Sequence, residues 1–176
     1  MTDDLRYPIG PFKFEGSLTD DRRLRAIEEI AEAPSKLRAA VKGLSDNQLD
    51  TPYRPGGWTV RQVVHHLPDS HLNSYTRFKL ALTEDEPTIK AYDESSWSQL
   101  EDARTAPIEI SLDLFDSLHR RFVLVLRSLT AEDLTRTFRH PEIGIVSLEK
   151  NLSLYAWHGR HHVAHITSLR KRMGWD

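Results

Sequence analysis

The chain has 176 residues, of which 39% are hydrophobic and 28% are charged, and its formal net charge is −2. This size and composition are typical of a single globular domain, here residues 1–176, and exclude a disordered chain. The weakly acidic balance excludes a global basic field, so we expect neither nucleic acid nor a membrane surface as a partner.

Three further absences narrow the class of protein. The sequence has no cysteine, which excludes disulfides, thiolate metal sites and cysteine nucleophiles. The first residues are acidic and lead into no apolar run, so we expect no signal peptide. No stretch approaches the ~20 apolar residues that span a bilayer. A cytoplasmic protein is the resulting expectation.

The chain begins with an extended arm and a helix. Residues 7–11 hold two prolines and a glycine, which favour an arm. A helical pattern follows from about Thr19, and Pro34 either kinks this helix or splits it in two. Residues 45–48 match a capping box, which predicts one short turn. The apolar positions of this first helical pattern are Leu24, Ile27, Ile30, Leu37, Val41 and Leu44.

A second long helix follows a predicted loop at residues 52–57. Residues 59–62 match another capping box, so the helix begins there. It runs to about Leu82, although Pro68 lies inside it. Its apolar stripe consists of Val60, Val63, Val64, Leu67, His71 and Phe78.

The second half of the chain predicts an irregular segment and two more long helices. Residues 84–107 are polar and irregular, with one short helical turn near Trp97 as an option. A third helix carries Leu112, Phe115, Leu118, Phe122, Val125 and Leu126. Ser147 caps a fourth helix that ends near Met173, and residues 144–147 form at most a short extended piece. Four amphipathic helices with almost no alternating runs predict an all-α four-helix bundle.

The last helix carries the clearest chemical signal among the nine histidines. On a helical wheel His162 lies in the apolar stripe, and His158 lies at its margin one turn earlier. Such a pair can reach one divalent ion at the usual ~2.0–2.1 Å, and Gly159 leaves room for an ion or a substrate. The alternative is a hydrogen-bonded core His162 with His158 as a bystander. His161 and His165 turn toward the outer side, which favours a supporting or a surface position.

The pair does not form the zinc peptidase motif. Gly159, Arg160 and His161 separate His158 from His162, so the glutamate that acts as general base in His-Glu-x-x-His is missing. The last helix therefore lacks the general base of a zinc peptidase, and a third metal ligand must come from elsewhere in the chain.

The second helix offers the third ligand as one of two adjacent histidines, His65 and His66. They flank the apolar stripe on opposite sides, and the wheel does not choose between them. His71, on the stripe itself, is predicted to be structural. The polar strip on the His66 side suits a pocket wall between helices. That strip includes Ser70, Asn73 and Arg77.

Two segments resemble signatures of the DinB/YfiT superfamily. GWTVRQVVHHLPDSH, residues 57–71, resembles its second-helix signature, and YAWHGRHHVAHI, residues 155–166, its last-helix signature. The likeness extends from Tyr7 to Trp175 and is strongest to the YfiT branch, described as metal-dependent hydrolases and including bacillithiol S-transferases. The resemblance implies a four-helix bundle, one zinc or nickel ion per chain, a cytoplasmic location and a homodimer.

The resemblance also implies which residues bind the metal. The family's three metal-binding histidines fall on His66, His158 and His162, which selects between the two adjacent histidines of the second helix. One departure is Pro68, where relatives have a small helix former; a proline there clashes with the preceding turn and can reorient the ligand before it. A second departure is His165, which extends the usual pair and whose role is open.

Three neutral histidines leave at least one coordination position open, as catalytic sites do. Water bound there can become hydroxide near neutral pH and attack an ester or amide bond. We therefore predict a metal-dependent hydrolase of a small-molecule substrate, with no general base identified. The first alternative is an S-transferase that holds an external low-molecular-weight thiol such as bacillithiol as thiolate. The second alternative is a non-catalytic, metal-dependent binding module.

Overall fold

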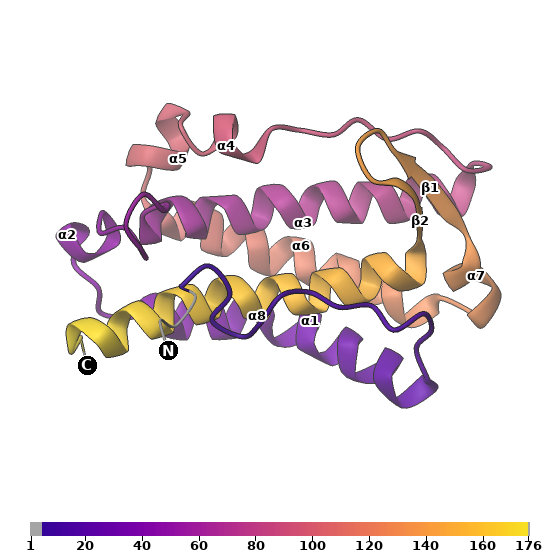
Figure 1. Cartoon of the computed structure of the whole chain (residues 1–176), viewed down its shortest axis with the longest axis horizontal. Helices are drawn as coiled ribbons and strands as arrows, with labels where there is room; N and C mark the ends of the chain where they lie inside the picture. Colours follow the sequence, from indigo (N-terminus) through magenta and orange to yellow (C-terminus); the bar gives the residue numbers. More distant parts are fainter. Residues whose placement is uncertain (1–4, 176) are drawn as a thin grey trace.

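The computed structural model describes residues 5–175, and four long helices form its body (Figure 1). They are α1 (Asp20–Val41), α3 (Val60–Thr83), α6 (Ile108–Ser128) and α8 (Leu148–Met173). The short helices are α2 (Asp46–Leu49), α4 (Glu94–Trp97), α5 (Glu101–Thr105) and α7 (Ala131–Thr135). The predicted four-helix bundle is confirmed. Within the described part, no helix has both the length and the apolar character that a membrane span requires.

The four long helices close around a shared core. α1 packs against α8 and α6, and α3 packs against the same two helices from the other side. α3 and α6 run in the same direction, because residues 84–107 carry the chain back along the whole length of α3 (Figure 1). The segment predicted as irregular is therefore a crossover that lies over α3 and carries α4 and α5.

Side-chain caps fix where the helices start. The Thr19 hydroxyl accepts a hydrogen bond from the Arg22 backbone N–H, which begins α1. Both predicted capping boxes form, between Ser45 and Gln48 at α2 and between Thr59 and Gln62 at α3. Each box satisfies backbone donors that the first helical turn leaves without a partner. The sequence therefore sets these boundaries locally.

The two internal prolines do not interrupt their helices. α1 continues through Pro34 and α3 through Pro68, so of the two alternatives for Pro34, a kink or a split, the split is excluded. A proline removes the hydrogen bond to the carbonyl four residues earlier. In α1 that carbonyl belongs to Ile30, and it receives another donor described below.

Two details of the sequence prediction are corrected. Residues 144–147 form strand β2 (Gly144–Ser147), but they pair antiparallel with a strand that the sequence did not reveal, β1 (Thr137–His140). Leu24, predicted among the apolar positions of the first helix, is 52% exposed. It falls outside the arc of α1 that carries the buried Ile27 and Ile30.

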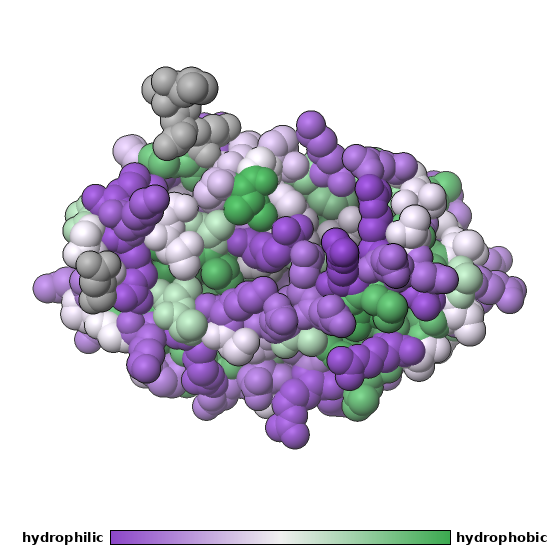
Figure 2. Space-filling model, turned by 90° about the horizontal axis from the view of Figure 1, so that it is seen from below, coloured by the Kyte–Doolittle hydropathy of each residue, from purple (hydrophilic) through white to green (hydrophobic). Residues whose placement is uncertain are grey.

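The face formed by α1 and the N-terminal arm shows hydrophilic side chains between smaller apolar areas (Figure 2). The arm lies along α8 (Figure 1) and is tied to it by hydrogen bonds. The Trp157 indole N–H donates to the Gly10 carbonyl at 3.2 Å, and the Leu18 N–H donates to Glu149 at 2.6 Å. The outer side of α8 is thus covered by the arm.

This cover decides between the two positions, supporting or surface, that the sequence allowed for two histidines of the last helix. His161 and His165 are 7% and 3% exposed, so neither lies at the surface. The helical wheel placed them on the outward side of α8 correctly, but it could not show that the arm packs there. His161 stacks on Trp157 with ring centroids 4.2 Å apart, and the ring of Tyr7 in the arm lies 5.8 Å from that of His161.

Candidate metal centre

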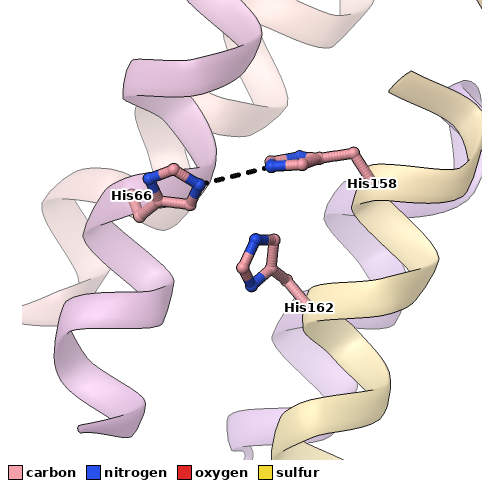
Figure 3. A group of neighbouring side chains, drawn as sticks. All are labelled: His66, His158 and His162. Atoms are coloured by element: carbon pink, nitrogen blue, oxygen red, sulfur yellow. Dashed lines mark hydrogen bonds between the residues drawn. The ribbon is translucent and has the colours of Figure 1, made fainter. Parts of the chain in front are cut away.

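Three imidazoles converge between α3 and α8. His66 comes from α3, and His158 and His162 come from successive turns of α8 (Figure 3). One ring nitrogen of each lies within 4.8 Å of the others, and the Nε2 atoms of His66 and His158 are 3.3 Å apart. The structure therefore brings together the three histidines that the resemblance selected.

A chain of hydrogen bonds through all four long helices fixes the proton on His158. His119 in α6 donates its Nδ1–H to the Ile30 carbonyl at 2.6 Å, which is the carbonyl that Pro34 deprives of its helical donor. The unprotonated Nε2 of a neutral His119 accepts from His71 Nδ1–H at 3.0 Å. His71 Nε2 in turn accepts from His158 Nδ1–H at 3.2 Å. His158 Nε2 is left as a lone pair that faces His66.

A second, shorter chain fixes His162. His165 donates its Nε2–H to the Arg6 carbonyl of the arm at 3.0 Å. The His165 Nδ1 atom is then an acceptor, and it lies 3.4 Å from His162 Nδ1. A neutral His162 therefore carries its proton on Nδ1 and keeps the Nε2 lone pair free. His165, whose role was open, orients a neighbouring histidine.

Burial keeps these histidines neutral. Desolvation lowers the pKa of His66 to about 4 and the pKa of His119 to about 4, although the Ile30 carbonyl raises the latter in part. Burial, and then the neighbouring histidines, lower the pKa values of His71, His158 and His162 well below 6.5. Protonation of any one of them is opposed by the apolar surroundings and by the others. Neutral imidazole is the form that binds metal ions.

The residues present fit a divalent transition metal ion. Two of the three rings have their Nε2 lone pairs fixed by hydrogen bonds from the far side, as metal-binding histidines commonly do. Imidazole donors suit zinc, nickel, copper and iron. Three ligands from two helices leave at least one coordination position for another molecule.

The adjacent His65 has a different role. Its Nε2–H donates to the Ala106 carbonyl at 3.1 Å, and its Nδ1 lies 2.7 Å from the Ser111 hydroxyl. Both nitrogens are thus occupied on the side of α3 that faces the crossover and α6. His65 fastens these segments, and the structure places only His66 in the cluster. Pro68 does not turn His66 away from it.

Gly159 does not make room for an ion or a substrate, as the sequence suggested. A Cβ atom there would lie 3.3 Å from the Ala33 Cβ and 3.8 Å from His71. The glycine permits close approach of α8 to α1 and to the buried His71. Glycine at this position therefore serves helix packing and not the space of the site.

A cavity of about 280 Å³ opens on the three histidines. Its wall comes from α3, α8, the crossover and the β-hairpin, so segments far apart in sequence enclose it. Of the predicted polar strip, Ser70 and Arg77 line the cavity, and Asn73 instead bonds the Asp69 carbonyl. Its other polar side chains are Tyr92, Glu94, His140, Glu142 and Tyr155.

Sequence reasoning did not single out His119, although a signal was present. His119 follows Phe115 by four residues on the buried face of α6, where only apolar side chains were expected. A polar residue on such a face must find a partner. Its partner is a carbonyl freed by a proline in another helix, which only the tertiary structure reveals.

Comparisons with known proteins show the family to which the chain belongs. The sequence profile of the DinB superfamily matches residues 29–166. A protein of Bacillus cereus strain B4264, named "Putative metal-dependent hydrolase", is 58% identical over 98% of this chain and 99% of its own length. A protein of Bacillus mycoides strain KBAB4 with the same kind of name is 56% identical over the same shares.

Solved structures show the same architecture. YfiT from Bacillus subtilis, described as "a probable metal-dependent hydrolase with an unusual four-helix bundle topology", superposes with a TM-score of 0.95 at 53% identity. The match covers 98% of this chain and 99% of that one. The four-helix bundle protein TT2238 shares the fold at a TM-score of 0.55 and 20% identity, over 80% of this chain and 94% of its own.

Proposed function

Because the chain belongs to the DinB superfamily, we propose that it is a metal-dependent hydrolase of a small molecule, with His66, His158 and His162 as metal ligands. The observation that carries the proposal is the convergence of three neutral imidazoles on a cavity. Two of these rings have lone pairs fixed by hydrogen bonds. Relatives more than half identical carry names that describe metal-dependent hydrolases.

The ion is zinc or, as a second choice, nickel, since both accept imidazole ligands. Bound there, it supplies Lewis acidity, which polarises a substrate bond and lowers the pKa of a coordinated water or thiol. The chain's own residues do the rest. His158 and His162 keep their protons on Nδ1, where His71 and His165 hold them away from the cavity.

Other wall residues orient the substrate and accept protons. The Ser70 hydroxyl lies 3.4 Å from the Tyr155 hydroxyl, and both are buried, so they offer hydrogen bonds to a polar group of the substrate. Glu94 and Glu142 line the same cavity and are exposed, which suits a proton acceptor in contact with solvent. One of these carboxylates supplies the general base that the last helix lacks.

The test measures turnover by protein that has been loaded with zinc and shown to hold it by elemental analysis. We expect hydrolysis in a panel of small esters and amides, loss of activity in His158→Ala, and retention in the matched variant His161→Ala. Product that forms only when an external thiol such as bacillithiol is added would replace hydrolysis by S-transfer. If zinc-loaded protein forms no product with or without thiol, the proposed enzymatic function is refuted, and a non-catalytic, metal-dependent binding module remains.

The predicted partners are proposals of the same kind. We expect a small-molecule substrate and a second copy of the chain as partners, since the resemblance implies a homodimer. Light scattering on the purified protein measures the mass in solution, and a monomer would refute the second of these expectations.

A further inference from the structure

A buried arginine lies in the wall of the cavity that contains the three histidines. Arg77, in α3, is only 9% exposed and lines the same space of about 280 Å³. His66, Ser70 and Arg77 follow one another along one side of α3, because their spacings of four and seven residues correspond to whole helical turns.

Within residues 5–175, the guanidinium of Arg77 has no hydrogen-bond or ion-pair partner. Its neighbours in the cavity wall include the exposed carboxylates of Glu94 and Glu142, but neither forms an ion pair with it. A guanidinium carries five N–H donors and a full charge, and those of Arg77 are open to the cavity, since none is among the fully buried side-chain atoms without a partner. Arg61, by comparison, is similarly buried and pairs with Asp46 and Asp50.

Its charge acts inside the cavity. Burial raises the pKa of Tyr155, and the positive charge of Arg77 partly offsets that rise, so the guanidinium lies near the phenol. Burial lowers the pKa of His140, and Arg77 lowers it further. The two carboxylates of the wall, Glu94 and Glu142, are exposed; Glu94 raises the pKa of Tyr155 and Glu142 raises the pKa of His140, so each opposes the effect of Arg77 in part.

The position of Arg77 defines one end of the space. Eleven residues separate it from His66, which is about 16 Å along the helix axis. Side chains of a helix point back toward its N-terminus, so the guanidinium reaches from its own turn toward Ser70 and His66. A molecule that touches both the histidines and Arg77 is therefore elongated, with different chemistry at its two ends.

We propose that Arg77 binds a carboxylate at one end of a small molecule whose other end reaches the histidine cluster. The planar fork of a guanidinium matches the two oxygens of a carboxylate, and the buried setting strengthens the pairing. The Ser70 and Tyr155 hydroxyls lie between the two ends and bond the middle of the molecule. The proposal rests on the proposed function, since it names the class of substrate or thiol that the metal site receives.

The experiment uses full-length protein loaded with cobalt, whose visible spectrum reports a thiolate that binds the metal. The probes are ω-mercapto carboxylic acids of increasing length and their matching neutral amides. We expect one chain length at which the acid binds about ten- to hundredfold more tightly than its amide, as for a hydrogen bond to a charged group. In Arg77→Gln this preference disappears, in Arg77→Lys part of it remains, and in the exposed control Arg127→Gln it is unchanged.

Equal affinities for acid and amide at every length, or a preference that survives in Arg77→Gln, would overturn the proposal. A parallel titration of metal-free protein with glutarate and glutaramide, read from the Arg77 side-chain resonances by NMR, tests the carboxylate site without the ion. Suppose that glutarate, but not glutaramide, shifts the Arg77 resonances, and that the protein also fails to bind metal when metal is added. This combination would support the carboxylate site and refute the metal site. The absence of such shifts in metal-free protein, together with equal affinities in loaded protein, would refute the carboxylate site alone.

Discussion

The hydrogen-bond chain from Ile30 to His158 can be tested by removing its middle member. His119→Phe keeps the aromatic volume in the core but leaves the Ile30 carbonyl and the His71 Nδ1–H without partners. A buried polar group without a partner costs about 1–3 kcal/mol, so two of them should lower the free energy of unfolding by about 2–6 kcal/mol. Pro34 makes the loss at Ile30 complete, because the helix supplies no donor there.

The same substitution should weaken metal binding from a distance. His71 without His119 is free to carry its proton on Nε2, which would push the His158 proton onto the nitrogen that faces the cavity. We expect a loss of about 10–100-fold in zinc affinity, the usual effect of removing the partner of a ligating histidine. Competition with a chromophoric chelator measures it. The matched control is His65→Phe. His65 is also a buried histidine with two hydrogen bonds, but it does not belong to the hydrogen-bond chain from Ile30 to His158.

Two results would refute this reasoning. One is a folded His119→Phe protein whose zinc affinity stays within about twofold of the parent, well below the expected range. The other needs no variant: nitrogen NMR of the metal-free protein should find the proton of His119, His71 and His158 on Nδ1. A proton on Nε2 of any of the three would contradict the proposed directions of these hydrogen bonds.

Further outcomes concern the ligands, the ion and pH. His158→Ala should abolish stoichiometric zinc by elemental analysis, whereas His161→Ala should not. His66→Ala should cost zinc affinity at least about 10–100-fold in a competition titration, and His65→Ala should cost less. Zinc at about a hundred times its dissociation constant should stabilise the fold by about 2.7 kcal/mol, and a melting curve indifferent to a chelator would contradict this. Burial lowers the pKa of His119 in the folded protein from 6.5 to about 4. Neutral His119 therefore contributes fully to the free energy of unfolding above about pH 6.5, and about 3 kcal/mol is lost as the pH falls toward 4. Urea titrations of the metal-free protein measure this loss.

Local sequence signals predicted the helices well. The two capping boxes, at Ser45 and at Thr59, are contacts between residues three apart, so they depend on nothing distant. The pair of His158 and His162 was found for the same reason, since their spacing alone places both on one face of α8. Strand β1 escaped because a short strand is defined by its pairing with β2, and its sequence carries no distinct period.

What the sequence could not supply are the contacts that cross the bundle. The wheel left His65 and His66 equivalent, and their roles differ only because α6 and the crossover lie on one side of α3 and α8 on the other. Likewise, the outward turn of His165 in α8 was predicted correctly, but its burial depends on the arm, whose Arg6 lies 159 residues earlier in the sequence. Such partners are set by topology, which no single helix encodes.

The proline in α1 has a consequence for protein engineering. A designer who wished to transplant this three-histidine site would copy α3 and α8, the helices that carry His66, His158 and His162. The copy would lack the carbonyl of Ile30, which is free to accept from His119 only because Pro34 stands four residues later in another helix. The smallest portable form of the site therefore includes a backbone irregularity on the far side of the bundle, and scaffolds built from ideal helices have no equivalent of it.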